Sequence, residues 1–94
     1  MILRSLTTER LYSLGDFRNI KFSDEIRDIP EEVALNKDAM ALLHYVQLLD
    51  TEYAYNRYLE LAKANNTIKQ EEILTFLESE RTRTFEDLLK TLKH

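Results

Sequence analysis

The residue types that most often carry chemistry are sparse in this sequence of 94 residues. Its two histidines, His44 and His94, have no pair of carboxylates beside them at the spacing of metal ligands. The chain has one glycine, which is too few for a phosphate-binding loop, and no cysteine, which excludes disulfides and thiolate chemistry. We therefore predict a protein that is not an enzyme and has no metal or other cofactor. No small-molecule substrate is evident.

The tyrosines are concentrated in one stretch, which holds four of the five: Tyr45, Tyr53, Tyr55 and Tyr58. Spacings of three and four place one set of residues on a single helix face: His44, Gln47, Thr51, Tyr55, Tyr58 and Ala62. Tyrosine offers a large contact area with a polar tip and is enriched at interface centres. We predict that four residues bind a protein partner or a second copy of the chain: Tyr55, Tyr58, Arg57 and His44. The alternative is that the rings cover the core with their hydroxyls in water.

Two arginines, Arg81 and Arg83, offer a different kind of surface. Basic groups near aromatic rings are what proteins use to bind single-stranded nucleic acid. Four carboxylates surround these arginines in the sequence and would cancel much of their field: Glu78, Glu80, Glu86 and Asp87. We therefore favour local ion pairing with these carboxylates, and nucleic-acid binding through Arg81 and Arg83 is the alternative.

The longest run that is compatible with a helix extends over residues 36–64 and contains neither Gly nor Pro. Asn36 can cap its first free N–H groups, and Asp38 follows in the first turn, where the helix dipole favours an anion. One apolar stripe has helical spacing: Ala39, Leu42, Leu43, Val46, Leu49 and Tyr53. A second stripe is formed by Tyr45, Leu48, Tyr55, Leu59 and Ala62. Such a helix is contacted on two sides by different elements, and an oligomer interface would give the same pattern.

Residues 1–24 predict a small β-hairpin. Gly15-Asp16 lies between two short runs that are rich in apolar and aromatic residues, as expected of a two-residue hairpin turn. In that register Leu11 faces Ile20. The alternative is a short helix over residues 8–14 that ends at the glycine.

The rest of the chain predicts further helical segments. Residues 23–28 are polar and indicate a loop or strand end, and the Pro-Glu-Glu sequence that follows predicts a short helical turn over residues 30–35. Thr67, followed three residues later by Gln, forms a capping box. It predicts a helix over residues 68–93, either continuous or broken near residues 82–84.

These elements predict an α+β fold that is mostly α. The two long helices, joined by a short turn at Asn65-Asn66, would form an antiparallel helical hairpin that carries the small N-terminal β-hairpin. Ninety-four residues are expected to form a single domain over residues 1–94. The net charge is −4 and is spread evenly, which argues against a dedicated duplex-binding surface. No apolar run reaches the roughly 18 residues of a membrane span, so we expect a soluble, cytoplasmic protein.

The run YSLGDFRNIKF, residues 12–22, resembles the LG-D/N-aromatic hairpin of small uncharacterised proteins from bacteriophages and other mobile elements. No functional residue is carried over from this resemblance. It implies a context in which small, acidic, non-enzymatic proteins bind a host protein and block or adapt it. We therefore predict a non-enzymatic protein-interaction module that acts in this way or self-associates. A nucleic-acid-binding accessory protein is the alternative.

Overall fold

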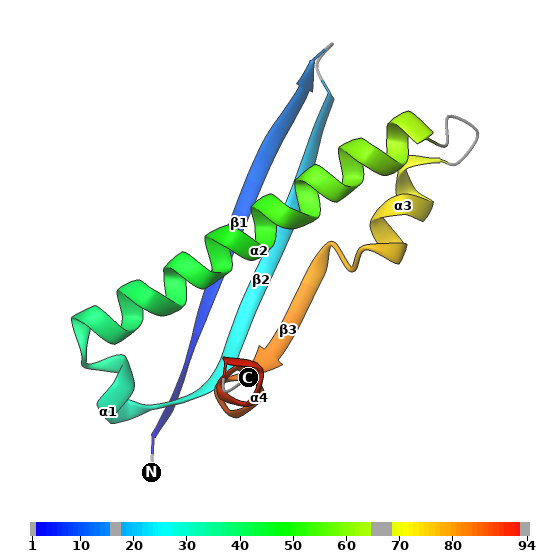
Figure 1. The fold of residues 1–94 in the computed structure, drawn as a ribbon. Helices are drawn as coiled ribbons and strands as arrows, with labels where there is room; N and C mark the ends of the chain where they lie inside the picture. Colours follow the sequence, from blue (N-terminus) through cyan, green and yellow to red (C-terminus); the bar gives the residue numbers. More distant parts are fainter. Residues whose placement is uncertain (1, 16–17, 65–68, 93–94) are drawn as a thin grey trace.

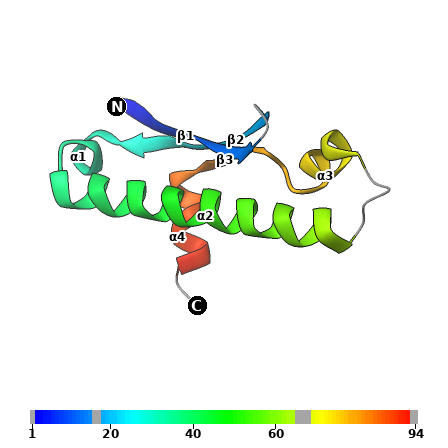
Figure 2. The same cartoon turned by 90° about the horizontal axis from the view of Figure 1, so that it is seen from above.

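The computed structural model describes residues 2–15, 18–64 and 69–92. The elements follow one another in this order: β1 (Leu3–Gly15), β2 (Arg18–Pro30), α1 (Glu31–Ala34), α2 (Lys37–Ala64), α3 (Gln70–Phe76), β3 (Glu80–Thr84) and α4 (Phe85–Leu92) (Figure 1). The strands form one sheet in the order β1-β2-β3, in which β1 and β2 are antiparallel while β2 and β3 are parallel. Figure 2 shows the long helix α2 running along one side of this sheet.

The predicted β-hairpin is present but much longer than expected, since β1 and β2 have 13 residues each. Residues 8–14 belong to β1, so the alternative of a short helix is not observed. β2 continues through residues 23–28, which the sequence indicated as a loop or strand end, and ends at Pro30. The buried residues Asp24 and Ile26 continue the period-two pattern of the strand. The predicted strand ended too early because Asp24, the first of these two inward-facing residues, carries a carboxylate.

The register of the hairpin decides which residues face α2. Tyr12 lies opposite Ile20, whereas the predicted turn placed Leu11 there. Opposite residues in a sheet share a face, so Tyr12 joins the buried Ile20 while Leu11 is 66% exposed on the other side. Gly15 has a φ of 80°, a left-handed conformation that glycine adopts readily. Asp16 of the predicted turn lies outside the described residues.

The predicted antiparallel helical hairpin is wrong. Residues 68–93 do not form one helix or two adjoining helices, because β3 lies between α3 and α4 and pairs in parallel with β2. The sequence of β3 alternates arginine and threonine after its first residue, and threonine is β-branched and favours strands. Its polar character hid the strand from a search for apolar periodicity. The predicted turn at Asn65-Asn66 and the cap at Thr67 lie outside the described residues.

The start of α2 agrees with the sequence. The Asn36 side-chain oxygen accepts hydrogen bonds from the backbone N–H groups of Asp38 (3.0 Å) and Ala39 (3.1 Å), so the predicted cap is present. α1 precedes it, within the helical turn expected over residues 30–35. Within the described residues, none of the helices combines the length and the apolar character that crossing a membrane requires.

The core consists of two apolar clusters. The first is built on Ile20, Phe22, Tyr58 and Ile73, and the second on Ile26, Ile29, Leu43 and Leu88. Four buried polar residues lie between the two clusters: Asp24 on β2, Gln47 and Thr51 on α2, and Thr8 on β1. We call these four residues the polar band. The fold therefore places its most unusual side chains where α2 crosses the hairpin.

Candidate functional site

Gln47 is the centre of the polar band and is fully buried on the side of α2 that faces the sheet. Its Nε2 donates hydrogen bonds to the carbonyl oxygens of Leu6 (2.8 Å) and Asp24 (3.0 Å). Its Oε1 accepts a hydrogen bond from the Thr8 hydroxyl (2.7 Å). Both amide hydrogens are therefore used, which removes the penalty of burying this group. The side chain joins α2 to both strands of the hairpin and fixes the position of the helix along it.

His44 was predicted to bind a partner, and its ring takes part in the same network. Its Nδ1 lies 3.1 Å from the Thr8 hydroxyl oxygen. A hydroxyl has one hydrogen, and Thr8 gives it to Gln47. The Thr8 oxygen can then only accept from His44, so Nδ1 carries the ring hydrogen. His44 is exposed, but one edge of its ring is committed to the fold.

Four charged side chains from three elements meet beside the polar band: Asp24 on β2, Asp50 on α2, and Arg81 and Arg83 on β3. We call them the ionic cluster. Arg83 Nη2 contacts Asp50 Oδ2 and lies 3.8 Å from Asp24 Oδ2. Arg81 Nη1 lies 3.9 Å from Asp50 Oδ1. Both arginines thus form ion pairs, but with carboxylates that are distant in sequence, so the local partners expected from the sequence are not the ones observed. The Arg83 side chain is only 11% exposed, so it is not available to a nucleic-acid phosphate.

Asp24 is the most buried member of the ionic cluster, with a side chain that is 2% exposed. Neither of its carboxyl oxygens has a hydrogen-bond partner among the described residues. Burial raises the pKa of Asp24 from 3.8 to about 6, and the neighbouring Asp50 carboxyl adds to the rise, while Arg83 opposes it. Below that pH the Asp24 carboxyl is neutral, which removes its repulsion with Asp50.

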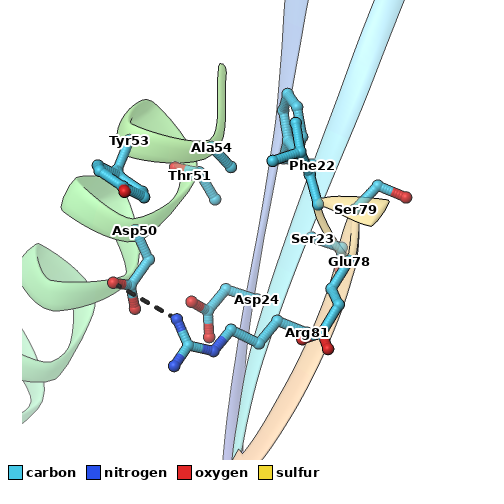
Figure 3. A pocket seen from close by; sticks show the side chains of 11 residues that line it. Phe22, Ser23, Asp24, Asp50, Thr51, Tyr53, Ala54, Glu78, Ser79 and Arg81 are labelled. Carbon is cyan, nitrogen blue, oxygen red and sulfur yellow. Dashed lines mark ion pairs between the residues drawn. The ribbon is translucent and has the colours of Figure 1, made fainter. Parts of the chain in front are cut away.

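A pocket of about 140 Å³ opens beside the ionic cluster, and Figure 3 shows Asp24, Asp50 and Arg81 facing one another at its wall. It is lined by Phe22, Ser23, Asp24, Asp50, Thr51, Tyr53, Ala54, Leu77, Glu78, Ser79 and Arg81. Typical small-molecule sites have roughly 300–1,000 Å³, so this pocket is small for a substrate. In the described part of the chain, no three His, Cys, Asp or Glu side chains are grouped to hold a metal ion. The chemistry that the cluster offers is ion pairing and the binding of one proton.

Two of the predicted partner-binding residues, Tyr55 and Tyr58, face the sheet. Tyr58 is 6% exposed in the first apolar cluster. The Tyr55 ring stacks on Tyr12, with 4.0 Å between ring centroids and 8° between ring planes. Arg57 is half-buried and pairs with Glu60 of the same helix at 2.7 Å. The sequence left open whether these rings bind a partner or cover the core, and the structure places both rings on the core.

The opposite side of α2 exposes large apolar side chains, and we call these four residues the outer face: Leu42, Tyr45, Leu49 and Tyr53. Their exposed fractions are 60%, 56%, 48% and 69% in that order. Spacings of three, four and four residues place them on one side of the helix. The buried residues of α2 occupy the other side: Leu43, Gln47, Thr51 and Tyr58. Figure 2 shows the sheet on one side of α2 only.

The outer face was visible in the sequence but was interpreted differently. Leu42, Leu49 and Tyr53 belong to the first apolar stripe, and Tyr45 to the second. The useful signal was that α2 has two apolar stripes. The sheet covers only one side of the helix, so apolar side chains on the other side stay exposed. Comparisons of the chain with protein-family models, with curated proteins and with solved structures gave no match.

Proposed function

We propose that this chain is a non-catalytic protein-interaction module that binds its partner through the outer face of α2. The observation that carries this proposal is the group of four large apolar side chains exposed together on one side of the helix. Single exposed apolar residues are normal on protein surfaces, whereas contiguous apolar patches of several hundred Å² mark interaction sites. At roughly 200 Å² for each fully exposed side chain, these fractions amount to about 450 Å².

The shape of the outer face favours a helical partner. A straight apolar stripe with spacings of three and four residues is complementary to a similar stripe on another helix. Tyr45 and Tyr53 are of the residue type that most often provides binding energy at interface centres. The buried side of α2 supports this role, because Gln47 and the ionic cluster fix the helix on the sheet and so hold the outer face rigid.

The test replaces one outer-face residue and one matched residue elsewhere. Leu49→Glu places a carboxylate in the middle of the outer face. Leu11→Glu makes the same change at a residue that is 66% exposed on the far side of the sheet. At protein concentrations too low for association, both variants should keep the far-ultraviolet circular dichroism spectrum and melting temperature of the wild type, because about half or more of each side chain is in water.

Each protein is tagged and used for capture from a native extract, with and without nuclease treatment, together with an untagged copy of the chain. We expect a stoichiometric protein to be retained by the wild type and by Leu11→Glu, and lost with Leu49→Glu. Equal capture by all three proteins would contradict the proposal. Loss of every captured protein on nuclease treatment would also contradict it and would favour nucleic-acid binding.

A further inference from the structure

We infer that the outer face binds the outer face of a second copy of this chain, with the two α2 helices antiparallel about a two-fold axis near residues 47 and 48. The inference rests on the proposed function and names its partner. It follows from the order of residues along the outer face, from the charges at its two ends and from its area.

The first argument is that the residues of the outer face are complementary to the same residues of a second copy that runs in the opposite direction. With the axis between residues 47 and 48, Leu42 of one copy lies opposite Tyr53 of the other. Tyr45 then lies within one residue of Leu49 of the other copy. Each aromatic ring meets a leucine, and each contact occurs twice because the interface is isologous. Tyrosine rings and leucines differ in size. Where they alternate across a pair of helices, the side chains of one helix pack into the grooves of the other.

The second argument is charge. In the antiparallel pair Asp38 lies opposite Arg57 of the other copy, at both ends of the interface. The Arg57 side chain is 40% exposed, and its only ion pair among the described residues is with Glu60, which is itself 64% exposed. Such surface pairs contribute little, so Arg57 can turn toward a new carboxylate. A parallel pair would instead place Asp38 and Glu60 opposite their own copies, where like charges repel.

The third argument is access and area. The exposed fractions of Leu42, Tyr45, Leu49 and Tyr53 show that the other described elements leave the outer face open to solvent. Figure 2 shows α4 extending past α2 beside the helix. Two outer faces would bury about 900 Å², and the charged ends bring the total close to the roughly 1,000 Å² expected of a specific interface. A chain of this length buries a modest share of its surface alone, and a dimer would increase that share.

The first experiment measures mass by size-exclusion chromatography with multi-angle light scattering over a range of protein concentrations. We expect the wild type and Leu11→Glu to approach twice the 11.2 kDa of one chain, and Leu49→Glu to remain at the mass of one chain. Asp38→Arg should weaken the dimer about tenfold, because it creates two repulsive pairs, and adding Arg57→Asp should restore it. These residues are exposed or half-buried, and circular dichroism checks that each variant is folded.

The second experiment measures the orientation of the helices. The chain has no cysteine, so Lys63→Cys gives a single site for a nitroxide spin label. With a rise of 1.5 Å per residue and helix axes 8–10 Å apart, pulsed dipolar spectroscopy should find the two labels roughly 47 Å apart in an antiparallel pair. In a parallel pair they would be roughly 10–20 Å apart.

Three outcomes would overturn the inference: a wild-type chain that stays monomeric at the highest concentration, a dimer that survives Leu49→Glu, or the short distance between labels. A monomeric wild type that still loses a captured partner with Leu49→Glu would leave the proposed function intact, because a different protein would then occupy the outer face. The double mass, the loss with Leu49→Glu, the charge-swap rescue and the long distance together would support the antiparallel dimer.

Discussion

Replacing Asp24 with Asn should make the stability of this protein less dependent on pH. In the folded chain burial raises the pKa of Asp24 to about 6, whereas its ordinary value is 3.8. Between these values the folded state binds more protons than the unfolded state, so the free energy of unfolding falls as the pH rises. The stabilisation is fully present below pH 3.8 and is lost as the pH passes through about 6.

The expected size of this effect follows from the shift. A displacement of about two pKa units, at 1.36 kcal/mol for each unit, corresponds to up to about 3 kcal/mol. The amide that the substitution introduces would be neutral at every pH and so would resemble the protonated carboxyl. The free energy of unfolding of Asp24→Asn minus that of the wild type should therefore rise by up to about 3 kcal/mol between pH 4 and pH 6.5 and then level off.

The assay is urea denaturation of both proteins, followed by circular dichroism at a series of pH values. Taking the difference removes the titration of the carboxylates that lie away from Asp24, which both proteins share. Glu9→Gln is the matched control, because it makes the corresponding carboxyl-to-amide change at a side chain that is 58% exposed. A difference for Asp24→Asn that stays flat or falls with pH would refute the reasoning, since it would mean that the attraction of Arg83 outweighs the cost of burial.

Three further substitutions test the fold. Gln47→Leu should lower the free energy of unfolding by about 2–4 kcal/mol in urea denaturation, because two buried carbonyls and one hydroxyl lose their partner; a loss below about 0.5 kcal/mol would show that the amide network is not formed. Tyr58→Ala should cost about 3–5 kcal/mol in the same assay and leave the mass of the dimer unchanged at concentrations where the chain is folded. Gly15→Ala should cost about 1 kcal/mol because of its positive φ, although nothing lies near the added Cβ, and an unchanged melting temperature would contradict that conformation.

The parts of this fold that follow from neighbouring residues could be predicted from the sequence. Asn36 caps α2 because its side chain reaches N–H groups two and three residues ahead, which is a purely local interaction. The hairpin could be expected because apolar runs lie on both sides of the single glycine. Its length and register could not, because they depend on which residues α2 covers.

β3 could not be predicted for a different reason. Its strand conformation depends on pairing with β2, and its arginines are held by carboxylates on other elements. Arg83 and Asp50 are 33 residues apart in the sequence. The four carboxylates close to the arginines in the sequence suggested local partners instead. Ion pairing could therefore be anticipated, but neither its partners nor the strand that it stabilises.

The two sides of α2 were the hardest part to assign, because polarity is a poor guide where buried polar groups find partners. Gln47 and Thr51 occupy inward positions that a hydrophobic pattern gives to the other side of the helix. The partners of Gln47 are carbonyl groups 41 and 23 residues away, so nothing near it in the sequence shows that it can be buried. Because such residues fill part of the inward side, the four large apolar residues of the outer face are left exposed.

This arrangement leads to a last prediction about the outer face. Its four side chains are about half exposed or more, so they contribute little to the core of one chain. The double substitution Leu42→Gln and Leu49→Gln should therefore change the free energy of unfolding by less than about 1 kcal/mol at concentrations too low for association. At high concentration the same variant should lose the extra stability that association gives the wild type. If the outer face stabilised the single chain instead, the loss in free energy of unfolding would be larger and would not depend on concentration.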